Sequence, residues 1–455
     1  MNKNILLSVA LSTTLLQADQ TIATMFSEGK VSGQIREFSI SRAVTDTRDA
    51  KEDYTRDANA IGGHLSYETA SYNGVTLGTS FHTTKGFLLD EGKTDYTKVD
   101  PTLLGPDNSD YSILGEAYMQ VQYKNTLFKG GRQKLNTPLA GGDDVRMIPN
   151  FFEAYLLANT DIEDTTLVLA HVTKFAQGTF GRAYGGGILA ATGGYSAVDD
   201  KDQVGQFVDM GKYAVGKETV GVTVASATYT GIENLKVQLW DYYAHDILNA
   251  VYGEASFSWN CLLTDKVKPF AAAQFIKEDN VGDNLLSGLG GDGEIDSLYY
   301  GLKFGAKVEN FTAYVAYSKT TDNDLGDNSY SHAIISPWGA MPAYTQGMVT
   351  RHVFLAGTEA IKVAASYNFK KFGPNLKTVL YYAQYSMEEF NGYTEGDTDE
   401  SGFDIIYNDA IIKNLQLRFR GNFSNDFYVK DTSDDATLNG TVGWSEYRFI
   451  ANYSF

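Results

Sequence analysis

The sequence has 455 residues and a formal net charge of −19, with 37 lysines and arginines against 56 aspartates and glutamates. This acidic balance, without any basic stripe, excludes nucleic acid as a general partner. Tyr (30), Phe (25) and Gly (45) are frequent while Pro (8) is scarce, and the single Cys261 excludes an intramolecular disulfide or a thiolate metal cluster.

Residues 1–18 have the pattern of a secretory signal peptide. Lys3 precedes an apolar run over residues 5–16, and the small Ala18 follows this run. We therefore predict cleavage between Ala18 and Asp19, which leaves residues 19–455 as one exported domain. After residue 18 no run of about 18 uncharged apolar residues occurs, which excludes a transmembrane helix.

From residue 30 onward, apolar and polar side chains alternate in segments, which is typical of strands with one dry and one wet face. Asn73-Gly74, a strong two-residue turn signal, joins the second and third of these segments. The pattern predicts eighteen strands, over residues 30–42, 58–72, 75–85, 111–124, 126–134, 150–159, 164–174, 218–229, 235–244, 247–259, 266–277, 296–308, 310–319, 357–369, 374–388, 402–410, 413–423 and 441–455.

The connections between these segments are alternately short and long, except for a short outer connection near His245 and Asp246. Short periplasmic turns and long external loops produce this alternation in outer-membrane barrels, whose strand number is even. A weak strand candidate at residues 204–214 is therefore placed in a loop. The closing strand ends on Phe455 and has one aromatic face, a common way for such a barrel to close. We predict an all-β fold, a transmembrane antiparallel up-and-down β-barrel of 18 strands with long external loops, one or more folded inward.

Acidic residues cluster in residues 46–57, 322–327 and 395–400. We interpret these clusters as solvated loops, with divalent-cation binding among lipopolysaccharide head groups as an alternative. The expected surroundings of the barrel are outer-membrane lipid and lipopolysaccharide.

Basic residues fall on the polar face of several predicted strands. In the strand over residues 413–423, Leu417 and Phe419 share one face, and Arg418 and Arg420 share the other. A lipid-facing arginine at mid-depth costs roughly 2–4 kcal/mol, so both arginines should face the lumen. The same reasoning predicts a basic ladder of pore-lining residues, namely Arg36, Arg418, Arg420, Arg448, Lys362 and Lys303.

Such a row of fixed cations would attract carboxylates along the pore. The alternative is that the ladder residues only pair with lumen acids such as Glu446, Glu116 or Glu153. Near the four arginines we find Glu446 as the only acid. Loop acids outside the pore are screened over a Debye length of about 8 Å at physiological salt, so the net charge of the chain does not decide this point.

The third long loop, within residues 131–155, has a different composition from the acidic loops. It combines apolar residues, two prolines and charges of both signs. This composition is typical of an ordered loop that folds inward, and an external loop packed on its neighbours is the alternative. The residues expected at the constriction are Arg132, Asp143, Asp144 and Arg146.

Several short blocks stand out along the chain: Ile35-Arg36-Glu37-Phe38, Gly131-Arg132-Gln133, Thr137-Pro138-Leu139, Asp144-Val145-Arg146-Met147-Ile148-Pro149 with Phe152, Tyr367-Asn368-Phe369, Gly373-Pro374-Asn375-Leu376, Lys413-Asn414-Leu415-Gln416-Leu417-Arg418 and Ser445-Glu446-Tyr447-Arg448. In this order they resemble the OprD-type substrate-specific porins. The resemblance implies an 18-stranded barrel, often monomeric, with inward loops and an arginine-rich ladder that guides small carboxylate-bearing solutes. Asn368 and Asn375 depart from the family pattern, and the Gly-rich fourth loop matches no pattern of the family.

No motif of a nucleophilic, metal-dependent or phosphate-binding enzyme is present, and the six histidines are scattered, with His64 and His82 on facing strands as the one pair. We therefore expect no enzymatic activity, no cofactor and no metal. The predicted function is passive diffusion of small hydrophilic solutes, expected to bear carboxylates, through a loop-constricted pore of a Gram-negative outer membrane. The alternative is a barrel-anchored surface protein whose acidic loops bind a partner, without an open pore. We expect a monomer, with a trimer as the alternative.

Overall fold

The computed structural model describes residues 21–47, 52–87, 98–183, 185–199, 204–289, 294–322, 330–388, 391–393, 396–428 and 440–455. The signal peptide predicted for residues 1–18 lies outside these ranges and stays a prediction. Part of the acidic cluster at 322–327 also lies outside them.

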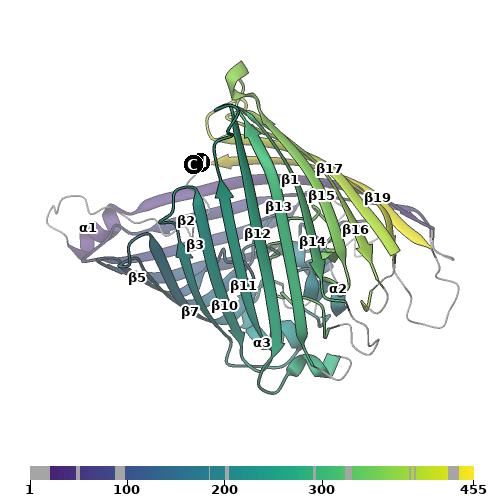
Figure 1. Cartoon of the computed structure of the whole chain (residues 1–455). Coiled ribbons are helices and arrows are strands. Elements are labelled where there is room, and N and C mark those ends of the chain that lie inside the picture. Colours follow the sequence, from purple (N-terminus) through teal and green to yellow (C-terminus); the bar gives the residue numbers. More distant parts are fainter. Residues whose placement is uncertain are drawn as a thin grey trace.

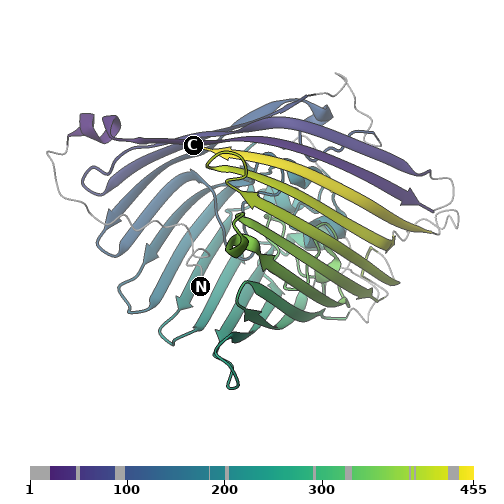
Figure 2. The same ribbon diagram turned by 90° about the horizontal axis from the view of Figure 1, so that it is seen from above.

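Antiparallel strands that pair in chain order form a closed barrel (Figures 1 and 2). The last strand pairs with the first, with Phe38 opposite Ile450, so the sheet has no free edge. The barrel strands in the described residues are β1 (Lys30–Asp46), β2 (Tyr54–Glu68), β3 (Val75–Gly86), β4 (Tyr111–Tyr123), β5 (Thr126–Gln133), β6 (Phe151–Asn159), β7 (Thr165–Ala176), β9 (Val222–Tyr229), β10 (Leu235–Ala244), β11 (Leu248–Ser258), β12 (Val267–Asn280), β13 (Asp296–Val308), β14 (Phe311–Thr320), β15 (Glu359–Asn368), β16 (Leu376–Met387), β17 (Gly396–Asn408), β18 (Leu415–Tyr428) and β19 (Thr441–Ser454).

These are the eighteen strands predicted from the sequence. The weak candidate at residues 204–214 is not part of the barrel, as predicted: its strand β8 (Val208–Asp209) pairs with β7 alone, and the helix α3 (Met210–Val215) follows. The hairpin at Asn73-Gly74 is also confirmed, because both residues have positive φ values of 50° and 84°. The short outer connection near His245 is confirmed between β10 and β11.

Two acidic clusters are more ordered than predicted. β17 begins at Gly396, so most of the cluster at 395–400 lies in a strand and not in a solvated loop. The strand β1 likewise continues to Asp46, and β2 begins at Tyr54. The prediction of solvated loops was therefore wrong for these parts. The strands continue into runs of polar residues, where apolar and polar side chains no longer alternate and the sequence pattern does not indicate a strand.

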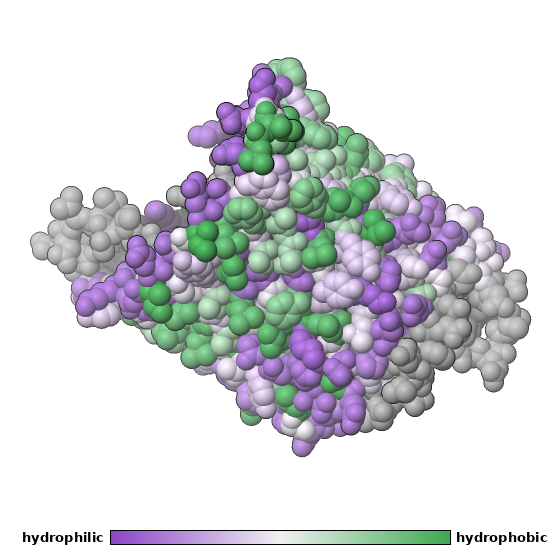
Figure 3. Space-filling model, in the orientation of Figure 1, coloured by the Kyte–Doolittle hydropathy of each residue, from purple (hydrophilic) through white to green (hydrophobic). Residues whose placement is uncertain are grey.

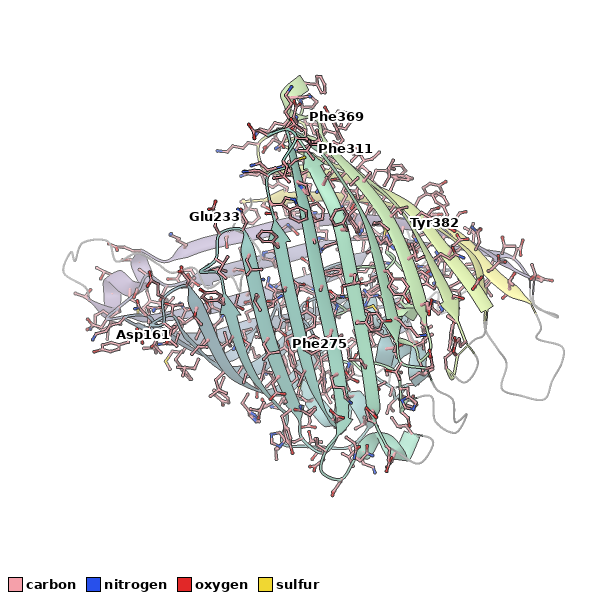
Figure 4. All side chains as sticks on the ribbon, viewed as in Figure 1. Asp161, Glu233, Phe275, Phe311, Phe369 and Tyr382 are labelled. Atoms are coloured by element: carbon pink, nitrogen blue, oxygen red, sulfur yellow. The ribbon has the colours of Figure 1, made fainter. Side chains whose placement is uncertain are left out.

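The two faces of the barrel wall differ as the alternation predicts. Large apolar residues point outward, with Phe419 41%, Tyr447 44% and Phe449 45% exposed, while Arg448 between two of them is 2% exposed. Figure 4 labels Phe275 and Tyr382 on the same outer wall, and Figure 3 shows hydrophobic residues gathered over these strands. The outer face is thus an apolar belt and the inner face is polar.

The helix α1 (Ile22–Ser27) precedes the first strand. Other short helices lie in the connections between strands, namely α2 (Gly187–Thr192) and the 3-10 turns η1 (Pro106–Asn108), η2 (Thr179–Ala183), η4 (Leu285–Leu289), η5 (His352–Phe354) and η6 (Phe369–Phe372). No helix in the described ranges is long and apolar enough to cross a membrane.

Described residues of several long loops fill part of the lumen. Three of these loops form the site, and we name them L3 (residues 134–150), L4 (177–221) and L7 (321–358). Their buried apolar residues, among them Leu139, Tyr213 and Ile334, pack in one cluster with inward residues of the wall such as Trp240 and Tyr299. The fold prediction of inward loops is confirmed, and the core of this protein lies inside the barrel.

Candidate functional site

L3 is attached to the barrel wall by an arginine of the first strand. Arg36 donates from Nη1 to the Asp144 carboxylate at 2.6 Å and to the Arg146 carbonyl. Its Nε donates to the Asn452 side chain on β19 at 2.9 Å. Desolvation inside the lumen would by itself raise the pKa of the Asp144 carboxyl, but the charge of Arg36 and its hydrogen bond outweigh this effect and hold the pKa below its ordinary value. Asp144 therefore works as an anchor of L3.

L3 also contacts the other two inward loops. The Gly141 amide of L3 donates to the Trp338 carbonyl of L7 at 3.0 Å. Asp143 accepts a hydrogen bond from Tyr195 of L4 and forms an ion pair of 3.2 Å with Arg351 of L7. The three loops thus form one block across the lumen, and Asp143 lies where they meet.

A polar cavity of about 490 Å³ lies between this block and the wall. Five basic side chains and one carboxylate, Asp143, are among the described residues that line it. The basic residues are Lys303, Arg351, Lys362, Arg420 and Arg448. The cavity therefore brings together four of the six ladder residues predicted from the sequence.

The arginines of the ladder are paired more fully than predicted. Arg418 and Arg420 share Asp404, at 3.3 Å for Arg420, and Arg448 pairs with Glu446. The expectation that Glu446 is the only acid near this run was wrong, because Asp404 and Asp144 also lie there. Asp404 points to the lumen from β17, as the two arginines do from the neighbouring strand β18. The register that places Asp404 opposite Arg420 could not be derived from the sequence.

Glu446, the acid predicted near the arginine run, is the centre of a buried charge cluster, and sequence reasoning missed its other members Arg42 and Arg146. Arg42 donates from Nε to its carboxylate at 2.5 Å, Arg448 pairs with it, and Arg146 approaches it to 3.9 Å. Three arginines thus share one carboxylate. Because Arg418 and Arg420 also share one, these two groups together hold five arginines and two carboxylates.

The two lysines of the ladder differ from the arginines. Lys303 lies over the Tyr344 ring at 3.9 Å, and Lys362 donates to the Gln346 carbonyl at 2.6 Å. Within the described part of the chain, neither ammonium lies within 4.0 Å of a carboxylate. Their charges are therefore the least compensated of those that line the cavity.

The residues predicted for the constriction loop do not act as one group. Asp143 lines the cavity, whereas Arg36, Asp144 and Arg146 hold L3 from the side. Arg146 is buried and donates to Thr102 at 2.9 Å. Arg132 points elsewhere: it lies over the Phe207 ring at 4.3 Å and 3.9 Å from Glu153.

Two residues of this site were missed entirely. Arg351 lines the cavity from L7, a loop that was not predicted to fold inward. Glu400 lies behind L7 on β17 and belongs to the acidic cluster predicted to be solvated. His64 and His82 do stack, with ring centroids 4.9 Å apart, but they do not line the cavity. In the described ranges no group of three His, Cys, Asp or Glu side chains is placed to hold a metal ion.

The family model for the outer membrane porins of the OprD family matches residues 24–455. Among solved structures, the chain is similar to Pseudomonas aeruginosa OccK9 (OpdG), at 18% identity and a TM-score of 0.73 over 95% of this chain and 99% of that one. It is also similar to OpdK of the same organism, solved with vanillate, at 15% identity and a TM-score of 0.71 over 95% and 99% of the two chains. The third structure is OccK2 (OpdF) of P. aeruginosa in complex with glucuronate, at 15% identity and a TM-score of 0.68 over the same shares.

At these low sequence identities, the similarity to solved structures is evidence for the fold only. No curated protein sequence matches the chain. The family model, in contrast, spans nearly the whole chain, and the closed 18-stranded barrel agrees with it. The chain therefore belongs to the OprD family of outer membrane porins and is an outer-membrane channel of a Gram-negative bacterium.

Proposed function

We propose that this porin lets small hydrophilic solutes that bear a carboxylate diffuse passively past the basic cavity. The single observation that carries the proposal is the lining of that cavity, where five basic side chains face one carboxylate. Selectivity then comes from pore width and fixed charge, without a chemical step.

The magnitude of the attraction supports this proposal. A carboxylate 4 Å from one ammonium gains about 1 kcal/mol at the dielectric constant of bulk water and about 4 kcal/mol at an effective value of 20. Lys303 and Lys362 supply this attraction most fully, because no carboxylate within 4.0 Å competes for them in the described residues. A solute in transit would exchange its carboxylate between these lysines and the neighbouring Arg420.

The relatives agree with this chemistry. Vanillate and glucuronate, the ligands named for OpdK and OccK2, are both carboxylates. For this chain, carboxylate preference is our proposal. We further propose that the channel works as a monomer and that its outer acidic residues contact lipopolysaccharide through divalent cations.

The test is single-channel recording of the refolded full-length protein in a planar bilayer, with titration of a small monocarboxylate and of its neutral amide. We expect discrete conductance steps that the carboxylate blocks and the amide does not. Steps indifferent to the carboxylate would overturn the proposed selectivity. The absence of steps would favour the alternative of a barrel-anchored surface protein.

A further inference from the structure

Glu400 is a buried carboxylate of the barrel wall that faces the inner side of L7. It lies on the same face of β17 as the lumen-facing Asp404, and its exposed fraction is 0%. An ionised carboxylate in such a position is unfavourable unless hydrogen-bond donors surround it. Glu400 takes those donors from L7.

Three consecutive backbone amides of L7 converge on this one side chain. Met348 donates to Oε1 at 2.5 Å, Val349 to Oε2 at 3.1 Å, and Thr350 to Oε2 at 2.6 Å. The hydroxyl of Tyr381, on the neighbouring strand β16, also donates to Oε1. Successive N–H groups that point to one anion form a nest, and here the anion belongs to the barrel itself.

The other side of the same segment forms the wall of the basic cavity. Gln346, Met348 and Arg351 all line it, and Arg351 reaches across to Asp143 of L3. Glu400 thus lies behind the segment and the solute path lies in front. The position of this segment fixes the width of the cavity at L7.

Neighbouring wall residues hold the segment at its ends by donating to its backbone carbonyls. Lys362 donates to the Gln346 carbonyl at 2.6 Å, and Thr320 donates to the Val353 carbonyl at 2.8 Å. Between these two points the three amides donate to Glu400, and the Met348 amide also approaches the Tyr381 hydroxyl at 3.3 Å. The ring of His352 packs against Tyr385 and Phe427 of the wall. Hydrogen bonds with a charged donor or acceptor are roughly twice as strong as neutral ones, so the bonds to Glu400 and the bond from Lys362 are the strong attachments of the segment.

We propose that Glu400 is a positioning residue that sets the shape, and through it the solute discrimination, of the constriction. This inference rests on the proposed function of the cavity as the solute path. It differs from the basic ladder in mechanism, because Glu400 acts through the backbone of L7 and never touches the solute.

The proposal separates two effects of neutralising this residue. Glu400→Gln keeps the size of the side chain but leaves one acceptor oxygen for three amides and one hydroxyl. If Glu400 positions L7, the segment becomes mobile. If Glu400 acts only as a negative charge near Lys362, its loss strengthens attraction for anions and leaves the loop in place.

The test is single-channel recording of full-length Glu400→Gln, compared with Glu309→Gln, which neutralises an exposed acid on the β13–β14 turn. For Glu400→Gln we expect transitions between substates at least tenfold more frequent than in the wild type and block by a small monocarboxylate at least fivefold weaker. Glu309→Gln should behave as the wild type. A quiet current with unchanged or stronger block would overturn the proposal.

A second variant tests the contact from the loop side. Gly347→Ala places a methyl group 3.0 Å from the Glu400 carboxyl and 2.9 Å from the Tyr385 hydroxyl, while the wall stays intact. It should increase substate transitions in the same direction, even if Glu400→Gln fails to fold. If the wild type conducts and the monocarboxylate blocks it, but the Gly347→Ala channel is quiet, the positioning role of Glu400 is refuted and the proposed function stands. A wild type without conductance or block would refute the proposed function instead.

Discussion

Lys303 offers the sharpest test of how charge acts in this channel. Its ammonium lies over the Tyr344 ring and lines the cavity, and no described carboxylate lies within 4.0 Å of it. Replacement by Met keeps the length and apolar packing of the side chain and removes only the charge. We expect Lys303→Met to weaken binding of a small monocarboxylate in the pore.

The magnitude follows from Coulomb's law and the geometry. At 4 Å the lost attraction is about 1 kcal/mol in bulk water and about 4 kcal/mol at an effective dielectric constant of 20. The lower value corresponds to roughly a fivefold rise in the blocking concentration. Because the Debye length falls from about 10 Å at 0.1 M to about 3 Å at 1 M salt, the effect should be smaller in 1 M salt.

The assay is block of single-channel current by the monocarboxylate at both salt concentrations. Lys303→Arg serves as the matched control, because it keeps the charge, and its block should stay near the wild-type value. An unchanged blocking concentration for Lys303→Met would refute the reasoning. So would an equal change for Lys303→Arg, which would indicate that shape and not charge matters at this position.

The remaining predictions concern the ladder, the wall and L3. Arg418→Ala with Arg420→Ala should reduce anion flux, because the double change removes two positive charges and leaves Asp404 as an unpaired carboxylate in the lumen; flux assays on liposomes measure this, and normal heat-modifiable mobility in electrophoresis confirms folding. Leu417→Arg places a charge on the lipid face at a cost of roughly 2–4 kcal/mol and should reduce the folded fraction in the same electrophoresis, while normal assembly would invert the assigned faces of β18. The pKa of Asp144 lies below its ordinary value of about 3.9, so its ion pair with Arg36 stabilises L3 fully above that pH and is lost as the pH falls through the lower folded-state value. The current should therefore stay quiet from pH 8 to about 4 and become noisy only as the pH falls further, and noise already at pH 6 would contradict this.

The wall of this barrel could be predicted from the sequence because its alternation is a local signal. In β18, Leu417 and Phe419 fall outward and Arg418 and Arg420 inward, and the penalty for a charge in lipid enforces this choice at every strand. Turn chemistry at Asn73-Gly74 is equally local. The inward L3 was predicted from composition, because its apolar residues need a surface to cover.

The partners of the inward charges could not be predicted in the same way. Asp404 lies opposite Arg420 because of the register between β17 and β18, which depends on all the strands of the closed sheet together. Glu400 looks like one more acid in an acidic run, and only the fold of L7 surrounds it with amide donors. The site therefore depends on contacts between segments far apart in the chain, for which one sequence gives no signal.

The central claim is that carboxylates pass through this basic constriction, and block alone does not separate passage from plugging. The most direct measurement is the zero-current potential of the refolded channel under a gradient of the potassium salt of a small monocarboxylate. We predict a potential displaced toward the equilibrium value of the carboxylate, because local cations outweigh the net charge of −19. A potential displaced toward the equilibrium value of potassium would contradict it.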